Sequence, residues 1–406
     1  MKKSKRTAGI RLAAYLLAAA CAFCMRPMES RAVNASGAIA RGVDVSMHNG
    51  AVDWGKVAGD GMTFTFIKVG STKSGVDPYF ASNITNAQAA GLRTGVYLYS
   101  YATTPQAAAQ EAELVLQWID GYTVNFPVVF DIEDKCHKNL SDQQLIDIIN
   151  AFCTAIDAAG YYPMVYSSKN MFAGKLAICG WDKWVAQYND SCEYDNNVCF
   201  WQYSSHGQVN GFPTRADVNY QYKDYSQIII PEGFVEHNGN VRFYRNWRMQ
   251  RGFVDYNGTR YFLDGAGNLV RGWLIDANAT YYLSPADGSI ARGQCVIDGG
   301  EYYFTAEGVQ MTGWVILEDG RYYYDTATAR LCRGFFNLGN DTYYADDAGR
   351  VVTGVYLIGD QPHYFDEAGL LVRNQHVVLD GKNYNTTQDG ILVEEAPAPA
   401  PAEGGV

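Results

Sequence analysis

A repeat of about 20 residues runs through the C-terminal half of the chain and limits the folds available there. Its marker is a glycine that follows arginine or threonine, and successive glycines lie 20 or 21 residues apart, at positions 252, 272, 293, 313, 334 and 354. Aromatic residues recur in phase, as at Tyr281-Tyr282. Each unit is long enough for one hairpin, which cannot bury its aromatic side chains alone. We therefore predict an all-β solenoid of stacked hairpins over residues 232–393.

Residues 38–225 show a different pattern, in which short apolar runs alternate with helical periodicity. The clearest helices are predicted from Ser141 to Ala159, where Ser141 and Gln144 form a capping box, and from Pro105 to Ile119. The strand candidates are residues 42–46, 63–69, 94–100, 127–132, 163–167, 183–188, 199–203 and 216–220. Eight strands alternating with helices predict an α/β fold, a parallel barrel of the (β/α) type.

Carboxylates follow the buried strand that begins at Phe126. Side chains alternate along a strand, so Asp131 and Glu133 point the same way while Ile132 points into the core. Two neighbouring carboxylates repel each other, which raises the pKa of one of them. A carboxyl group that keeps its proton near neutral pH is suited to general acid catalysis. By itself, such a pair is also compatible with a metal site or a solvated strand end.

Two more aspartates, Asp44 and Asp217, lie at the ends of the first and last predicted strands. The first and last strands of a closed barrel are neighbours, so both side chains are predicted to face the same pocket as Asp131 and Glu133. The chain after the leader holds no Cys-x-x-Cys with a partner histidine, so we expect no metal and no cofactor.

The net charge limits the possible partners, and the N-terminus indicates export. A net charge of −11 without a basic stripe argues against a nucleic-acid partner. Residues 1–32 combine a basic start with an apolar run from Leu12 to Phe23, which is typical of a secretory signal peptide. No later segment is long and apolar enough to span a membrane. Residues 394–406 are predicted to form a disordered, Ala-Pro-rich tail.

A series of short motifs extends over residues 40–222, in an order and at spacings that can be compared with those of known families. They are Gly-Val-Asp-Val-Ser-Met-His-Asn-Gly at 42–50, Val-Asp-Trp at 52–54, Phe-Ile-Lys at 66–68, Asp-Pro-Tyr-Phe at 77–80, Gly-Val-Tyr at 95–97, Val-Phe-Asp-Ile-Glu at 129–133, Trp-Val-Ala-Gln-Tyr at 184–188 and Trp-Gln-Tyr-Ser-Ser at 201–205. This series resembles the family-25 glycoside hydrolases, the muramidase-type lysozymes. The resemblance implies an irregular β/α barrel.

The resemblance also implies an activity, hydrolysis of the β-1,4 bond from N-acetylmuramic acid to N-acetylglucosamine in peptidoglycan. Glu133 would be the general acid, and Asp131 would stabilise the transition state or orient the acetamido group of the substrate. Asp44 and Asp217 would tune charge or position water. An endo-N-acetylglucosaminidase, a chitinase and a non-catalytic wall-binding protein are the alternatives.

Four aromatic residues are candidates for stacking on sugar rings: Tyr99, Tyr101, Tyr188 and Trp201. Each of them could instead belong to the core. One departure from the family pattern concerns the segment after the second strand, where this chain has Val69-Gly70-Ser71-Thr72 and the family often has Ala-Thr-Glu-Gly. A contribution of that glutamate to the substrate site is not expected here.

The C-terminal repeats resemble choline-binding, or cell-wall-binding, repeats, whose aromatic side chains form cages for choline on teichoic acids. Only Trp273 and Trp314 follow the marker glycine, as the family pattern prefers. Trp314 with Tyr322 and Tyr323 is the predicted cage. The ligand is choline, another wall polymer or a glucan. The expected protein is a secreted, wall-associated enzyme whose repeats hold it on its insoluble substrate.

Overall fold

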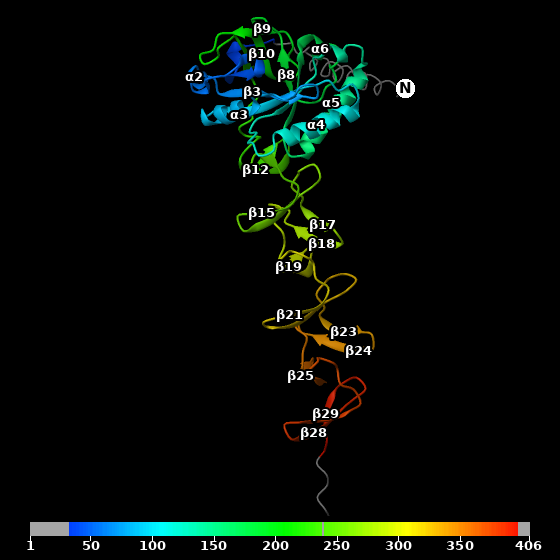
Figure 1. The fold of residues 1–406 in the computed structure, drawn as a ribbon. Coiled ribbons are helices and arrows are strands. Elements are labelled where there is room, and N and C mark those ends of the chain that lie inside the picture. Colours follow the sequence, from blue (N-terminus) through cyan, green and yellow to red (C-terminus); the bar gives the residue numbers. More distant parts are fainter. Residues whose placement is uncertain (1–31, 238, 397–406) are drawn as a thin grey trace, which may run out of the picture. The chain divides into compact units, whose positions relative to one another are not determined.

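The computed structural model describes residues 32–237 and 239–396. The predicted signal peptide, apart from Ala32, and most of the predicted tail lie outside these residues. The described chain forms two compact units (Figure 1). The first unit extends to Gly252 and includes Gly265–Asn268, and the second holds Phe253–Asp264 and the chain from Leu269 onward. Within the described residues, every helix is too short or too polar to cross a bilayer.

The first unit is built on a closed barrel. Its strands are β2 (Ala40–Val45), β3 (Phe64–Ser71), β5 (Arg93–Tyr99), β6 (Val128–Asp131), β7 (Pro163–Ser168), β8 (Lys183–Ala186), β10 (Val198–Gly207) and β11 (Ala216–Gln221). The order around the barrel is β2-β11-β10-β8-β7-β6-β5-β3, and β3 pairs with β2 to close it. All eight predicted strands are confirmed. The prediction of a fully parallel barrel is wrong in one strand, because β11 runs antiparallel to both of its neighbours.

Helices cover only part of the barrel. They are α2 (Trp54–Gly59), α3 (Phe80–Ala89), α4 (Pro105–Trp118), α5 (Asp142–Ala158) and α6 (Lys169–Ala173). The 3-10 turns η1 (Ala35–Gly37), η2 (Met47–Asn49) and η3 (Lys135–His137) and the short strands β1 (Val33–Asn34), β4 (Gly75–Val76) and β9 (Ser191–Cys192) complete the unit. The predicted capping box of α5 is confirmed, since Ser141 and Gln144 exchange side-chain-to-backbone hydrogen bonds.

Alternation along β6 decides which side chains enter the barrel. Phe130 points outward and stacks on Phe152 of α5, with ring centroids 4.4 Å apart. Val129 points inward, where it joins the cluster that contains Phe66 and Trp184. Ile132 is fully buried with the outer cluster, as predicted. Asp131 therefore points into the barrel at the carboxyl end of β6.

The opposite end of the barrel is filled by the chain that follows β11. Tyr225 is fully buried there, and its ring lies 5.6 Å from those of Phe126 and Phe200. Its hydroxyl donates a hydrogen bond of 2.7 Å to Asp182. Ile228 and Ile229 belong to the same cluster.

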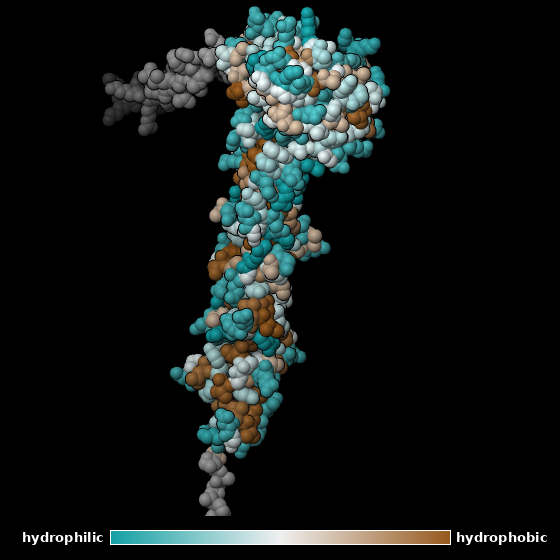
Figure 2. Space-filling view, turned by 60° about the vertical axis from the view of Figure 1, so that its left-hand side comes forward, coloured by the Kyte–Doolittle hydropathy of each residue, from teal (hydrophilic) through white to brown (hydrophobic). Residues whose placement is uncertain are grey.

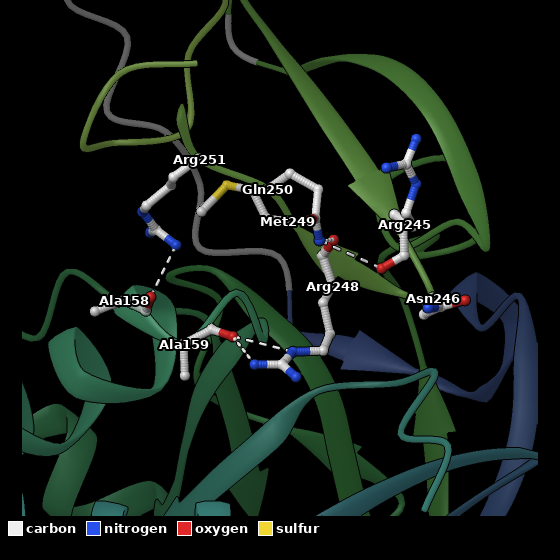
Figure 3. A pocket seen from close by; sticks show the side chains of 8 residues that line it. All are labelled: Ala158, Ala159, Arg245, Asn246, Arg248, Met249, Gln250 and Arg251. Atoms are coloured by element: carbon white, nitrogen blue, oxygen red, sulfur yellow. Dashed lines mark hydrogen bonds between the residues drawn. The ribbon is translucent and has the colours of Figure 1, made fainter. Parts of the chain in front are cut away.

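A further hairpin packs against the C-terminus of α5 (Figure 3). In it β12 (Glu232–His237) pairs with β13 (Asn240–Arg245), and β14 (Arg248–Met249) adds a third strand beside β13. Arg248 donates to the carbonyl oxygen of Ala159 at 2.9 Å, and Arg251 donates to that of Ala158 at 3.0 Å. These carbonyls belong to the negative end of the helix and have no partner inside it. The first hairpin of the repeat region is thus bonded to the barrel unit.

The second unit is a series of hairpins (Figure 1). They pair β15 (Gly252–Tyr256) with β16 (Thr259–Leu263), β17 (Gly272–Asp276) with β18 (Ala279–Leu283), β19 (Gly293–Ile297) with β20 (Gly300–Phe304), β21 (Gly313–Leu317) with β22 (Gly320–Tyr324), β23 (Gly334–Leu338) with β24 (Asp341–Ala345), and β25 (Gly354–Ile358) with β26 (Gln361–Phe365). A sheet of β27 (His376–Leu379), β28 (Lys382–Thr386) and β29 (Leu392–Glu394) follows.

Turn chemistry and backbone hydrogen bonds explain the stacking of these hairpins. Asn257 and Gly258 both have positive φ, 50° and 77°, as a two-residue hairpin turn with the twist of the strands requires. The N–H of Gln310 donates to Thr280 O at 2.8 Å, which joins segments 30 residues apart. The predicted series of stacked hairpins is confirmed. Ile316 is among the apolar side chains that remain exposed. Figure 2 shows apolar residues among polar ones on the surface of the repeats.

Candidate active site

A pocket of about 270 Å³ opens where the barrel strands end. It is lined by Asp44, Ser46, His48, Lys68, Tyr97, Tyr99, Asp131, Glu133, Tyr166, Trp184, Tyr188, Gln202 and Asp217. The four predicted carboxylates are all in this set. Closure of the barrel brings them together. Four strands separate β2 from β6 in the strand order, and the pairing of β3 with β2 closes the ring so that both strands face the same interior.

Asp44 and Asp217 are direct partners across the antiparallel pair β2–β11. Their side chains therefore share one face of the sheet at close range. Oδ2 of Asp44 accepts hydrogen bonds from Gln202 Nε2 at 2.9 Å and from Asn219 Nδ2 at 2.8 Å. Burial raises the pKa of Asp44 well above its ordinary value, and the charge of Asp217 adds to the effect despite these hydrogen bonds. Burial also raises the pKa of Asp217, so both carboxyl groups of the pair favour the protonated form more than they would in water.

Asp131 and Glu133 differ in exposure. Asp131 is 3% exposed, and its Oδ1 is buried without a hydrogen-bond partner among the described residues. Burial raises the pKa of Asp131 well above the usual range, Glu133 adds to this, and Lys68 opposes it. Glu133 lies at the mouth of the pocket and reaches solvent. Its pKa is also raised, first by loss of water around the carboxyl group and then by the charge of Asp217.

Lys68 is a pocket residue that the sequence did not single out. It follows Phe66 by two positions on β3, so it points into the barrel as Phe66 does. Its ammonium group lies 5.0 Å from the centre of the Tyr99 ring. Its positive charge lowers the pKa values of Asp131 and Glu133. Lys68 could have been predicted from the Phe-Ile-Lys motif, because alternation along the strand turns its side chain toward the carboxylates.

Two of the four predicted aromatic residues line the pocket, and a third contacts one of them. Tyr99 lines the pocket, and Tyr101 stands beside it with ring centroids 5.2 Å apart. Tyr188 lines the pocket and is 55% exposed. Trp201 does not belong to the site: it is 1% exposed and packs against Tyr203 and Tyr220. The correction follows from alternation, because Gln202 points into the pocket and Trp201 therefore points outward.

Tyr166 and Gln202 are two other residues that sequence reasoning missed. The hydroxyl groups of Tyr166 and Tyr188 donate to the same oxygen of Gln202, at 2.9 and 3.0 Å. Since Gln202 in turn donates to Asp44, these side chains form one connected network. Tyr166 is the register partner of Asp131 on β7, so its strand-end position was the available signal.

The segment that departs from the family pattern takes part in a different set of contacts. Thr72 Oγ1 donates to Oε1 of Glu111 at 3.1 Å, and Ser100 Oγ donates to Oε2 of the same carboxylate at 2.6 Å. Glu111 comes from α4 and is buried. Lys73 follows Thr72 in the sequence, and its ammonium group lies 3.4 Å from the centre of the Tyr101 ring. A lysine on an aromatic face thus stands close to the position where the family often has its glutamate.

The predicted wall-ligand residues form two aromatic clusters in the repeats. The ring of Trp273 lies 4.9 Å from that of Tyr282 and 5.2 Å from that of Tyr302. The ring of Trp314 lies 5.1 Å from both Tyr323 and Tyr343. In each cluster two rings come from one hairpin and the third from the next.

Tyr322 does not take the place predicted for it beside Trp314. It is 3% exposed, packs with Val315 and Tyr324, and donates its hydroxyl to Asp319 at 2.8 Å. Tyr323 and Tyr322 are adjacent on a strand, so only one of them can face the tryptophan. The guanidinium group of Arg321 lies 4.4 Å from the centre of the Trp314 ring. A cation of the protein itself therefore already occupies one face of this tryptophan.

Known proteins resemble both parts of the chain. Glycosyl hydrolases family 25 matches residues 43–212, and the choline-binding repeat matches residues 291–329. The uncharacterized protein YegX of Escherichia coli O157:H7 is 31% identical over 205 residues, which cover 48% of this chain and 74% of YegX. The autolytic lysozyme of Clostridium acetobutylicum is 26% identical over 198 residues, 48% of this chain and 58% of the lysozyme.

Solved structures include the modular autolysin LytC from Streptococcus pneumoniae, which is 28% identical, with a TM-score of 0.42 over 45% of this chain and 46% of LytC. The identity to YegX extends over most of that protein, and the family-25 match contains Asp44, Asp131 and Glu133. The chain therefore belongs to family 25 of the glycosyl hydrolases, and it is a glycoside hydrolase of the cell wall that carries choline-binding repeats.

Proposed function

We propose that the protein is exported and cleaves the β-1,4 bond from N-acetylmuramic acid to N-acetylglucosamine in peptidoglycan. The observation that carries this proposal is the position of Glu133, a carboxyl group with a raised pKa at the mouth of a pocket that holds three more carboxylates. A protonated acid beside stabilising negative charge is the arrangement that glycoside hydrolysis requires. The relative from Clostridium is named an autolytic lysozyme, which supports a lysozyme activity for this chain as well.

In this proposal Glu133 donates its proton to the oxygen that leaves, because it is the most exposed of the four acids and so the one that the substrate reaches. Asp131 stabilises the positive charge that develops on the sugar, or it accepts a hydrogen bond from the acetamido N–H. Its buried Oδ1, which has no partner in the described protein, would gain one in the second case. The pair of Asp44 and Asp217 tunes the charge of the pocket or positions the water molecule.

Analysis of the new reducing ends of digested peptidoglycan tests the proposed bond. A muramidase leaves N-acetylmuramic acid at each new reducing end. An endo-N-acetylglucosaminidase leaves N-acetylglucosamine there, and this result would contradict the proposal. A chain that releases neither product, with walls from several bacterial sources as substrate, would be a wall-binding protein without hydrolytic activity on them.

The pH dependence of kcat/KM is expected to shift in opposite directions in two variants. Activity is lost as pH rises through the pKa of Glu133, because the acid must be protonated. Asp217 raises this pKa and Lys68 lowers it. Asp217→Asn should therefore move the alkaline limb to lower pH, and Lys68→Met should move it to higher pH. The measurement is the midpoint of that limb in the free enzyme. Shifts of the same sign in both variants would exclude Glu133 as the titrating acid.

The repeats are proposed to bind choline on teichoic acid through the cluster of Trp273, Tyr282 and Tyr302. A quaternary ammonium group is attracted to aromatic faces by about 0.5–2 kcal/mol. Trp273 is 42% exposed, and the ring of Trp314 already carries Arg321 on one face. Trp273→Ala is therefore expected to weaken choline binding roughly 2- to 30-fold, and Trp314→Ala to weaken it less. Elution of the full chain from a choline resin measures both. Unchanged retention of the Trp273 variant would point to a different wall polymer.

A further inference from the structure

A second pocket lies at the carboxyl-terminal end of α5 (Figure 3). Its volume is about 420 Å³, within the range of small-ligand sites. They include three arginines and no carboxylate, and all of the lining residues belong to the barrel unit. The lining residues are Ala158, Ala159, Arg245, Asn246, Arg248, Met249, Gln250 and Arg251, none of which lines the catalytic pocket. The proposed hydrolysis uses none of them.

Positive charge is concentrated beside this pocket. Arginines recur at every third position, at residues 242, 245, 248 and 251. Glu232 pairs with Arg245 at 3.0 Å, and Asp157 pairs with Arg251 at 3.1 Å. Arg248 forms no ion pair with any residue that the structure describes. In a protein with a net charge of −11, the pocket is thus a local excess of positive charge.

The guanidinium group of Arg248 is held in a fixed orientation. Its Nε and Nη2 both donate to Ala159 O, at 3.2 and 2.9 Å, and the group lies 5.0 Å from the centre of the Tyr161 ring. The backbone is fixed as well, since Gln250 Nε2 donates to the carbonyl oxygen of Arg248 at 2.8 Å. A guanidinium group has five N–H donors, so those of Nη1 are available on this exposed residue. An anion that binds them orders little that is not already ordered.

The carbonyl end of α5 would by itself disfavour an anion, because it is the negative end of the helix. Here the carbonyl oxygens of Asp157 and Ala158 accept from Arg251, and that of Ala159 accepts from Arg248. Figure 3 shows both guanidinium groups turned toward this end of the helix. The two arginines therefore offset the negative end of α5, and an approaching anion meets their positive charge.

We propose that this pocket, called here the arginine pocket, binds a phosphate group of a phosphodiester polymer in the cell wall. A guanidinium group matches the oxygen atoms of a phosphate and forms charge-assisted hydrogen bonds with them. The exposed amide of Asn246 lines the same pocket and supplies a neutral donor. Teichoic acid, the polymer proposed above to carry choline, has such a phosphate backbone. The inference rests on the proposed function only for this choice of polymer, because it involves neither Glu133 nor the aromatic clusters.

Calorimetric titration of choline-free poly(glycerol phosphate) into the full chain tests this site. The parent is expected to bind the polymer, and Arg248→Ala to weaken that binding about three- to tenfold, because a charge-assisted contact is lost. Arg248→Lys keeps the charge without the planar fork, so its dissociation constant should lie between the two. The difference between parent and Arg248→Ala should shrink at high salt, since salt screens exposed charges. The lysine variant decides the test if the alanine variant does not fold.

Arg373→Ala is the matched control, because it removes another exposed arginine, one that does not line the pocket. It should bind the polymer as the parent does. Parental affinity in both Arg248 variants would overturn the proposal. So would an equal loss of binding to polyglutamate, which indicates a site for any anion, or binding only to inorganic phosphate or to phosphatidylglycerol vesicles. A chain that cleaves walls but does not bind the polymer fails this proposal alone, whereas the reducing-end analysis decides the proposed function separately.

Discussion

Glu133→Gln is expected to lower kcat on peptidoglycan by about two to four orders of magnitude, the usual contribution of a general acid. Glutamine has nearly the same shape as glutamic acid but cannot donate a carboxylic proton to the bridging oxygen. The raised pKa of Glu133 shows that the surrounding protein favours its protonated form. Substrate binding should change little, so KM is expected to stay close to that of the parent. Release of reducing ends from purified walls, measured at saturating substrate, gives kcat directly.

Glu113→Gln provides the matched control, because it makes the same chemical change at an exposed position of α4 that does not line the catalytic pocket. It should clear walls at the parental rate. If Glu133→Gln also cleared walls at that rate, Glu133 would not be the acid, and the catalytic assignment of the pocket would be refuted. A loss in both variants would indicate a general effect of the lost charge on wall binding.

A chain that ends at Asp224 is expected to be several kcal/mol less stable than a chain that ends at Asn268. The shorter chain lacks Tyr225, Ile228 and Ile229, which fill the base of the barrel. Burial of each such side chain contributes about 1.5–3 kcal/mol, and a whole domain is stable by only about 5–15 kcal/mol. The shorter chain also lacks the hairpin that bonds to the end of α5 (Figure 3). Calorimetric unfolding of the two chains measures the difference.

Substitution of one residue separates the packing from the polar contact. Tyr225→Ala in the full chain should cost about 3–5 kcal/mol, as large-to-small core changes do. In a unit of this size, that loss corresponds to a fall in Tm of roughly 6–20 °C. Tyr225→Phe keeps the ring and removes only the hydrogen bond to Asp182, so it should cost about 1–3 kcal/mol. Equal Tm values for the chains ending at Asp224 and Asn268 would show that the base of the barrel does not depend on this segment.

Local patterns were sufficient for most of the fold. The eight strands, the capped helix α5 and the hairpins all follow from alternation, capping residues and turn residues that act within a few positions of one another. Such patterns do not predict the direction of β11, because a strand has the same alternation whichever way it runs. Local patterns also do not predict that the hairpin of β12 and β13 belongs to the barrel unit. Arg248 and Arg251, which follow this hairpin, donate hydrogen bonds to carbonyl oxygens about 90 positions away.

The predicted position of the four acids in one pocket agrees with the structure, whereas the prediction of the other pocket residues was incomplete. Asp44, Asp131, Glu133 and Asp217 do line one pocket, which strand-end positions had indicated. Trp201 was placed there on its residue type, whereas its position next to Gln202 turns it outward. The ion pair of Lys169 and Glu193 could not be predicted from local patterns, because the two residues are 24 positions apart and meet only in the folded chain.

The sequence by itself determined the chemistry of this protein: four carboxylates at strand ends, a repeat of aromatic hairpins and the motifs of a glycosyl hydrolase family. These features are local, so the order of residues is enough to specify them. Only the tertiary structure decided which groups meet. Closure of the barrel sets Asn219 and Gln202 against Asp44, which lies 175 and 158 positions away from them. Burial in that closed pocket then raises the pKa values of Asp44, Asp131 and Glu133, because water is excluded from carboxyl groups that the chain alone would leave solvated.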